Sequence, residues 1–553
     1  MKRFPKLSIL ITCLLLASLL LACGGTPTEE PAAPAEGQQT EPTAVPEPVA
    51  TQGGTLVFGM SYEPATLDPH VGSSYEGATV DRAVFDTLVR QDTDGTFHPG
   101  LAASWEISED GLTYTFHLKE GVKFHDGTPF NAEAVQFNFD RIIAPETASE
   151  QAIALVGPYA SAEVVDDQTV KLILSEPFGP FLSGIAQPNI GIVSPTAVAK
   201  YGDLFADNLV GTGPFLFKEY VRADHITVVR NPDYNWGSDL FDHAGPAYLD
   251  EIQFKFIEEA LVRSGTLETG ETNLINDVAP DDFVRFDADA KYATYNIIQP
   301  GTPLAVAMNV NKPPLDDVKV RQAIEYAIDK KAIVDTLFAG LYDLAYSPLT
   351  PNTLGYWKGS EELYAYDPEK AKSMLAEAGW TDSDGNGILD KGGTPFKITW
   401  PTFKWQRMNE MATVMQAQLM EVGIDLSVDV VGFSAMYEAA NKCEHNMVHT
   451  GNTDADPNAL SIVYNSANVG NGWAWSCMKD DEIDQLLKEG RTTTDPAARI
   501  PIYEKLQQRI LDLALVIPIR QFTNLLASEA TVQGLRFEPI GFAPEFYDVH
   551  IEK

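Results

Sequence analysis

The chain has 553 residues, which is too long for one ordinary hydrophobic core and predicts two or three lobes. Hydrophobic residues make up 44% of it, so each lobe can bury a sizeable core. Aspartate and glutamate number 78 against 39 lysines and arginines, which gives a formal net charge of −39. Such an acidic chain is a poor match for nucleic acid or anionic lipid, because phosphate groups require clustered positive charge.

The first 22 residues have the layout of a signal peptide. Lys2, Arg3 and Lys6 precede an apolar run over 7–22, which is too short for a comfortable membrane span. The run ends in Leu-Leu-Ala-Cys-Gly, which resembles a lipobox, so we expect cleavage before Cys23 and lipid on its sulfur. An uncleaved N-terminal anchor is the alternative, and either outcome places the body of the protein outside the cytoplasm.

Residues 23–52 are interpreted as the lipidated cysteine followed by a disordered linker. The linker is rich in Pro, Glu, Thr, Ala and Gln and has almost no large apolar residues. A segment of this composition cannot bury enough apolar surface to offset the entropy that it would lose on ordering. We expect a flexible tether that holds a folded body near a membrane partner without fixing its orientation.

The segment 101–142 predicts a compact unit of strand, turn and helix. Apolar and polar residues alternate over 112–118, which is typical of a strand with one buried face. Asn131 can then cap a helix whose apolar residues recur on one face. By itself this pattern indicates no more than a well-packed structural unit.

Helices and strands alternate through the rest of the chain without an internal repeat, which is typical of mixed α/β lobes. A short strand is expected over 55–59. After an extended apolar run at 305–311, Asp316 or Asp317 can cap one helix and Asp329 the next. The order of elements therefore favours an α/β fold over an all-helical or all-strand one.

No sequence motif for catalysis stands out. The glycine-rich run 210–215 lacks the Gly-Lys-Ser/Thr ending of a phosphate-binding loop, and no zinc-protease or serine-hydrolase motif occurs. His445 and His449 lie four apart on a predicted strand, which puts them on one face but far apart, so a shared metal is disfavoured. A pair of carboxylates could still perform hydrolysis, and a cleft hydrolase stays the enzymatic alternative.

Three stretches together resemble the family 5 extracellular solute-binding proteins, the oligopeptide-, dipeptide- and nickel-binding proteins of bacterial ABC importers. The first is 101–127, which contains Leu-Ala, Ser-Trp, Asp-Gly and Gly-Val pairs at the family's places. The second is Val-Arg-Gln-Ala-Ile-Glu-Tyr-Ala-Ile-Asp from Val320, and the third runs over 367–380. The resemblance extends over essentially the whole chain after the linker.

The resemblance implies an α/β chain with the two-lobe periplasmic-binding-protein fold of type II. It further implies the large class with an extra subdomain in lobe 1, and a hinge that links the lobes around a ligand cleft. The boundaries expected from it are 53–300 plus 527–553 for lobe 1, about 80–210 for the extra subdomain, 301–526 for lobe 2, and crossings near 299–304 and 520–526.

The same resemblance implies a binding protein rather than an enzyme. We expect a monomeric receptor, lipid-anchored through Cys23 to the outer face of the cytoplasmic membrane, in the periplasm or at the cell surface. It would capture a small extracellular solute by lobe closure and deliver it to an ABC permease. Short peptides are the expected ligands, and an oligosaccharide or a nickel complex is the alternative. No cofactor is required.

The resemblance also points to a ligand site. Peptide-binding members carry an Asp shortly before an Asp-Pro, and this Asp receives the α-ammonium of the peptide. Asp454 is the best match and Asp456 the next, although the spacing is shorter here and Gly451-Asn452 stands where many relatives have a Trp. A turn stabilised by the Asp side chains is the alternative. Further cleft contacts are expected from Tyr62, Glu63, Trp405, Tyr437, Trp473 and Trp475, or these aromatic residues belong to the core.

Two cysteines remain in the body of the chain, Cys443 and Cys477, as a disulfide or as two separate thiols. Cys477 and the tryptophans before it resemble a Trp-Cys segment of dipeptide-binding relatives, which carry the partner cysteine in the preceding loop. That loop has no cysteine here, and the resemblance then points to Cys443 as the partner of Cys477.

An acidic loop suggests a possible calcium site. Asp382, Asp384, Asn386 and Asp390 have the spacing with which an EF-hand-like loop begins. The bidentate Glu of such a loop is replaced by Gly393. A structural calcium and a metal-free acidic turn both stay open at this point.

Overall fold

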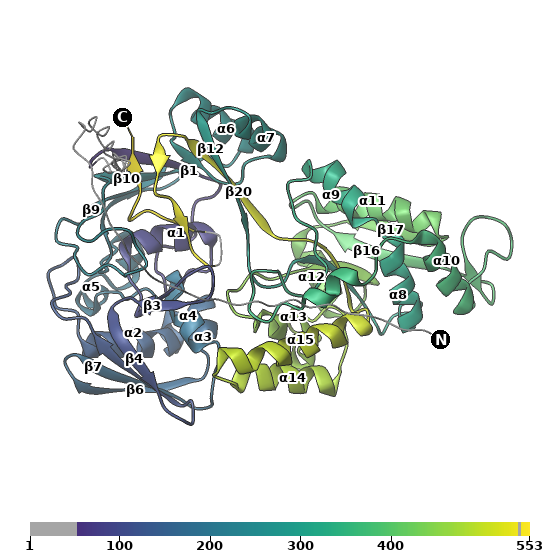
Figure 1. Cartoon of the computed structure of the whole chain (residues 1–553), viewed down its shortest axis with the longest axis horizontal. Helices are drawn as coiled ribbons and strands as arrows, with labels where there is room; N and C mark the ends of the chain where they lie inside the picture. Colours follow the sequence, from purple (N-terminus) through teal and green to yellow (C-terminus); the bar gives the residue numbers. More distant parts are fainter. Residues whose placement is uncertain (1–51, 540–542, 553) are drawn as a thin grey trace, which may run out of the picture. The chain divides into compact units, whose positions relative to one another are not determined.

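The computed structural model describes residues 52–539 and 543–552 (Figure 1). The predicted signal peptide, Cys23 with its predicted lipid, and nearly all of the predicted linker lie outside these residues. In the part of the chain that is described, no helix has both the length and the apolarity needed to cross a bilayer.

A seven-stranded sheet forms the centre of the first lobe. Its strand order is β12-β20-β11-β1-β10-β9-β8, in which β1 runs parallel to β10 and β11 and the other pairs are antiparallel. The strands are β1 (Thr55–Met60), β8 (Phe215–Val221), β9 (His225–Arg230), β10 (Glu251–Phe256), β11 (Leu274–Ile275), β12 (Tyr292–Ile298) and β20 (Thr523–Glu529). The helices of this region are α1 (Tyr75–Val84), α5 (Pro195–Tyr201), α6 (Ala260–Thr269) and α7 (Pro280–Asp287).

A separate antiparallel sheet, in the order β4-β5-β7-β6, has its own buried core. It confirms the strand predicted from alternation, because Tyr114, Phe116 and Leu118 of β5 are buried. Helix α2 begins as predicted, since the Asn131 side chain accepts a hydrogen bond from the Ala134 amide. The elements are β2 (Val89–Gln91), β3 (Phe97–Pro99), β4 (Ala102–Ile107), β5 (Thr113–Leu118), β6 (Tyr159–Asp166), β7 (Thr169–Leu174), α2 (Ala132–Ile143), α3 (Gln151–Val156) and α4 (Phe181–Ile185).

The second lobe contains a three-stranded antiparallel sheet, β18-β13-β19, and a parallel pair, β16 and β17. Asp317, rather than Asp316, caps α8, and Asp329 caps α9. The strands are β13 (Leu304–Met308), β14 (Asp390–Lys391), β15 (Thr394–Pro395), β16 (Lys397–Thr402), β17 (Asp425–Val430), β18 (Met447–Thr450) and β19 (Val516–Arg520). The helices are α8 (Val318–Ala327), α9 (Lys330–Phe338), α10 (Pro368–Glu377), α11 (Met408–Glu421), α12 (Phe433–Asn441), α13 (Ala459–Tyr464), α14 (Asp481–Thr492) and α15 (Pro496–Asp512).

The chain passes between the two lobes twice. It leaves the seven-stranded sheet after Ile298 and enters the three-stranded sheet at Leu304, then returns between Arg520 and Thr523. Residues 523–526 were expected in lobe 2, but β20 pairs with β12 from its first residue and belongs to the lobe 1 sheet (Figure 1). We propose these two crossings as the lobe boundaries.

The C-terminal tail packs on the first lobe. Its short strands are β21 (Val532–Gln533), β22 (Arg536–Phe537), β23 (Pro544–Glu545) and β24 (His550–Ile551). Phe546 contacts Phe58 and Phe254, and the side chains of Arg90 and Glu545 form a buried ion pair of 3.1 Å. The tail therefore contributes to the core of the sheet with which the chain began.

Candidate functional site

Three neighbouring cavities share the side chain of Trp405, which is 41% exposed. Trp405 lies between β16 and α11, and the next two residues, Gln406 and Arg407, adopt left-handed backbone with φ of 42° and 60°. Helix α11 starts only at Met408, and the Trp405 ring lies 6.1 Å from that of Phe522, measured between centroids. The cavities have volumes of about 300, 210 and 360 Å³.

The polar cavity, of about 300 Å³, takes its wall from both lobes. Its lining residues are Tyr75, Glu76, Asp277, Gln299, Trp405, Gln406, Gly451, Asn452, Thr453, Phe522, Thr523 and Asn524. Burial raises the pKa of Glu76, and the nearby Asp277 adds to the effect. The Ser61 hydroxyl donates to Glu76 over 3.3 Å. Two carboxylates in a wall that is otherwise uncharged make this cavity suited to a cationic group.

The aromatic cavity, of about 210 Å³, adjoins the polar one. Its lining residues are Leu304, Phe403, Trp405, Phe433, His449, Thr450, Gly451, Trp473 and Phe522. The Phe403 ring lies 6.0 Å from that of Trp405 and 5.3 Å from that of Phe433, measured between centroids. A Cβ atom at Gly451 would lie 2.5 Å from the Phe522 ring, so only glycine lets this ring reach the cavity wall.

His449 is the one ionisable side chain in the wall of the aromatic cavity. Burial lowers its pKa to about 4, so the imidazole is neutral at physiological pH. Its Nδ1 atom is buried and has no hydrogen-bond partner among the residues described. The ring lies 5.1 Å from Phe403 and 6.5 Å from Trp405, so it forms part of the aromatic wall.

The third cavity, of about 360 Å³, also borders Trp405 and includes Tyr62, Arg263 and Asp277. Arg263 is not available as an anion receptor, because it donates to the backbone carbonyls of four residues. Tyr62 is 59% exposed and does reach the cavity, as the sequence predicts for a cleft residue.

Arg520, the last residue of β19, bonds to the turn that follows Trp405. Its guanidinium donates to Gln406 Oε1 over 2.9 Å, and its Cζ lies 4.7 Å from the Phe338 ring and 4.6 Å from the Tyr342 ring. No carboxylate pairs with it in the described part of the chain, and burial lowers its pKa to about 10. The residue therefore links the lobe crossing to the turn that carries Trp405.

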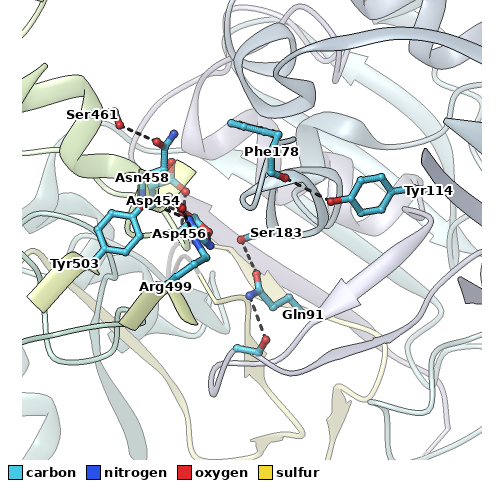
Figure 2. Close-up of polar contacts among 12 residues, drawn as sticks. Gln91, Tyr114, Phe178, Ser183, Asp454, Asp456, Asn458, Ser461, Arg499 and Tyr503 are labelled. Carbon is cyan, nitrogen blue, oxygen red and sulfur yellow. Dashed lines mark hydrogen bonds and ion pairs between the residues drawn. The ribbon is translucent and has the colours of Figure 1, made fainter. Parts of the chain in front are cut away.

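Asp454 and Asp456 differ in what surrounds them (Figure 2). The carboxylate of Asp456 accepts two hydrogen bonds from the buried guanidinium of Arg499, at 2.6 and 2.7 Å. The carboxylate of Asp454 accepts one hydrogen bond of 3.0 Å, from the Asp456 amide. Burial, and then the charge of Asp456, raises the pKa of Asp454 to about 7. Asp456 is thus occupied by Arg499, while Asp454 retains acceptor capacity.

Asp456 and Arg499 also border a fourth cavity, of about 270 Å³, with Gln91 and Ser183 of the first lobe. The Ser183 hydroxyl donates a hydrogen bond of 2.9 Å to Gln91 Oε1, and this bond does not involve the Asp456–Arg499 ion pair (Figure 2). Asp454 stands in the sequence between Thr453, which lines the polar cavity, and Ala455, which lines the fourth.

Of the remaining residues predicted for the cleft, one lines a cavity and the others pack behind or beside the cavity walls. Trp473 lines the aromatic cavity, whereas Trp475 is 1% exposed, stacks on Trp473 and donates to Asn441 Oδ1. Tyr437 packs edge-on against both tryptophans. Glu63 accepts a hydrogen bond of 2.8 Å from the Tyr220 hydroxyl, so it braces lobe 1 and does not line any of the four cavities described.

Cys443 and Cys477 form a disulfide in the structure, with an S–S distance of 2.03 Å. This is the pairing that the resemblance implies. The bridge ties the end of α12 to the segment that carries Trp473 and Trp475. It therefore fixes one wall of the aromatic cavity to the body of the lobe.

The acidic loop uses its oxygens internally. Asp382 accepts hydrogen bonds from the amides of residues 385, 386 and 387, and Asp390 accepts from the amide and hydroxyl of Ser383. Asn386 donates its side-chain amide to Asp384. Over residues 52–539 and 543–552, no three or more His, Cys, Asp or Glu side chains converge as metal ligands. The arrangement has the features of a self-bonded turn.

Sequence reasoning missed several wall residues. Phe403 was missed although it follows directly after β16 and lies two residues before Trp405, which was expected in the cleft. Phe433, His449 and Phe522 come from separate segments, and Glu76 and Asp277 from the other lobe. Nothing in their local sequence indicates that they meet.

Comparison with known proteins adds independent findings. A family model for bacterial extracellular solute-binding proteins, family 5 (middle), matches residues 96–473. The chain is 31% identical to heme-binding protein A of Haemophilus influenzae, over 92% of this chain and 94% of that protein. It is 30% identical to the dipeptide-binding protein of Escherichia coli K12, over 91% and 96% of the two chains. The structure of NikA from Brucella suis in complex with Fe(III)-EDTA matches with a TM-score of 0.79 at 27% identity, covering 90% of this chain and all of that one.

Proposed function

Because this chain belongs to the family 5 bacterial extracellular solute-binding proteins, we propose that it captures a small extracellular solute and delivers it to the permease of an ABC importer. The solute would bind one lobe, the other lobe would close over it, and the permease would recognise the closed form. The chain itself would catalyse no reaction.

The observation that carries this proposal is the group of cavities around Trp405. Their walls come from both sides of the two lobe crossings, so a bound solute would touch both lobes at once. A ligand with contacts to two lobes stabilises the arrangement in which both sets of contacts are made. This is the property that a closure-based receptor requires.

Short peptides are the ligand class that we propose. One relative is named a dipeptide-binding protein, and the carboxylates of Glu76, Asp277 and Asp454 suit a peptide ammonium. In this proposal Asp454 receives the α-ammonium, because Asp456 is already bonded to Arg499. An oligosaccharide or a nickel complex is the alternative, and the heme-binding relative and the Fe(III)-EDTA complex of NikA show that chelates also occur among similar proteins.

We further propose that the mature chain is a monomer anchored by lipid on Cys23, at the outer face of the cytoplasmic membrane. The sequence pattern at 1–23 supports this placement. Palmitate labelling of the expressed precursor would test it, with Cys23→Ala as the unlabelled control. Labelling that persists in Cys23→Ala would contradict the anchor.

Native mass spectrometry of the purified chain tests the ligand class directly. We expect an adduct of peptide mass, and saturable binding of dipeptides by calorimetry that Trp405→Ala weakens. Prolonged incubation with a bound dipeptide should return it unchanged. Hydrolysis of the dipeptide would favour the enzymatic alternative, and a chelate or sugar adduct would replace the peptide assignment.

A further inference from the structure

The aromatic cavity has a composition that is uncommon for a surface depression. Five benzenoid rings line it, and they come from four separate segments of the chain: Phe403, Trp405, Phe433, Trp473 and Phe522. An apolar cavity of about 150 Å³ is large enough to hold a benzene molecule. At about 210 Å³ the aromatic cavity has room for one aromatic side chain.

The rings at its edge are left in solvent. Trp405 is 41% exposed and Phe433 is 46% exposed, which is a large exposure for apolar rings. Exposed apolar rings grouped around a depression mark a binding surface more often than a defect in packing. The chain also supports this wall: Arg520 bonds to the turn after Trp405, and Gly451 admits the Phe522 ring.

His449 adds a sixth ring to the wall of the cavity. Its side chain is 4% exposed, and its ring lies 5.1 Å from that of Phe403, measured between centroids. The imidazole is neutral at physiological pH, so the wall of this cavity carries no charge that would disfavour an apolar ring.

The aromatic cavity also continues into the polar cavity. The two share Trp405, Gly451 and Phe522 as common wall. A solute that fills both would place a polar part in the polar cavity and a ring among the aromatic side chains.

We infer that the aromatic cavity is a specificity subsite for one aromatic ring of the ligand. The inference rests on the proposed function and narrows it, since the preferred solutes are then short peptides with an aromatic side chain. Ring stacking and edge contacts with five aromatic neighbours supply the selectivity over aliphatic side chains.

Calorimetry with four dipeptides on the full mature chain tests the subsite: Ala-Tyr, Ala-Phe, Ala-Leu and Ala-Ala. We expect Ala-Tyr and Ala-Phe to bind about tenfold more tightly than Ala-Leu and Ala-Ala. Phe433→Ala should remove this preference for the ring.

Tyr366→Ala is the matched control, because Tyr366 is 44% exposed and lines none of the cavities around Trp405. It should leave all four affinities unchanged. Phe433 is exposed in the same way, so its removal should not unfold the chain. Equal affinities for the four dipeptides, or a ring preference that survives Phe433→Ala, would overturn the inference.

A second measurement separates this inference from the proposed function. If no dipeptide binds, the peptide assignment fails, and free phenol and indole then probe the cavity alone by ligand-observed NMR, with cyclohexanol for comparison. Contacts from phenol and indole that disappear in Phe433→Ala would still support the aromatic subsite. Absence of such contacts, or equal contacts from cyclohexanol, would overturn it.

Discussion

The two neighbouring carboxylates of Asp454 and Asp456 differ in how many hydrogen bonds they accept, and this difference decides which of them can bind a ligand. Asp456 has two bonds from Arg499 and is committed to them, whereas Asp454 has one bond from a backbone amide. Burial raises the pKa of Asp454 to about 7, so near neutral pH the carboxyl group is protonated in part of the molecules and ionised in the rest. A ligand ammonium can replace that proton as the partner of the carboxylate.

The pH dependence of ligand affinity follows from this. An ammonium requires ionised Asp454, so we expect dipeptide affinity to rise roughly eightfold from about pH 6 to about pH 7.5. The free energy of unfolding of the unliganded chain should fall over the same rise in pH. The reason is that native Asp454 keeps a proton that the unfolded chain releases above about pH 4. Calorimetry at several pH values measures the first effect. In Asp454→Asn the affinity should be flat with pH, and an unchanged slope there would contradict the role of Asp454.

The buried ion pair beside it should be structural. Replacing Asp456 by Ala leaves the Arg499 guanidinium, which is 2% exposed, without a counter-charge. We expect the free energy of unfolding in urea to fall by about 3–5 kcal/mol. Glu176→Ala is the control, since its pair with Arg491 is exposed and should contribute less than about 1 kcal/mol. Equal losses from the two variants would show that burial of the pair does not matter.

At the scale of single residues, the sequence predicted part of the site. Trp405, Trp473 and Tyr62, which were expected in the cleft, line cavities, and each lies outside the helices and strands. His449 and Phe522 reach the same space from a strand edge and a lobe crossing, where side-chain direction depends on how distant segments pack. Trp475 has a similar local sequence but is buried behind Trp473, on which its ring stacks, so the local sequence does not tell which of the two rings lines the cavity.

Among the features of the secondary-structure elements, the starts of helices were predicted better than the partners of strands. Asn131, Asp317 and Asp329 cap helices as expected, because a cap depends on two or three neighbouring residues. The sheet to which β20 belongs was not predicted. β19 and β20 are both largely buried strands separated by two residues, and neither sequence specifies its partner strand.

The disulfide permits a prediction for the segment that it closes. Cys443 and Cys477 are 34 residues apart, and a loop of that length implies a stabilisation of about 4 kcal/mol. We expect the double variant Cys443→Ser, Cys477→Ser to lose about that much free energy of unfolding in urea. The wild-type chain measured with a reductant should match the double variant. Agreement between the oxidised wild type and the double variant would contradict the prediction.

On the scale of the whole molecule, ligand binding should appear as stability. A solute that binds only the folded chain, present at about 100 times its Kd, adds about 2.7 kcal/mol to the free energy of unfolding. Urea unfolding with and without the dipeptide measures this, and Trp405→Ala should show a smaller gain at the same concentration. A gain of equal size in Trp405→Ala would place the ligand outside the cavities around Trp405.

The position of β20 also has a consequence for biosynthesis. β20 lies between β12 and β11 in the seven-stranded sheet, and all the other strands of that sheet are complete by Ile298. On the ribosome the first lobe must therefore wait, with a strand missing from its sheet, until the whole second lobe has been synthesised. During that interval β12 lacks the partner with which it pairs over its full length, and an unpaired strand is a hazard for aggregation. We therefore expect folding of this chain to depend on protection of the nascent polypeptide, and mRNAs truncated before Thr523 to give an insoluble product.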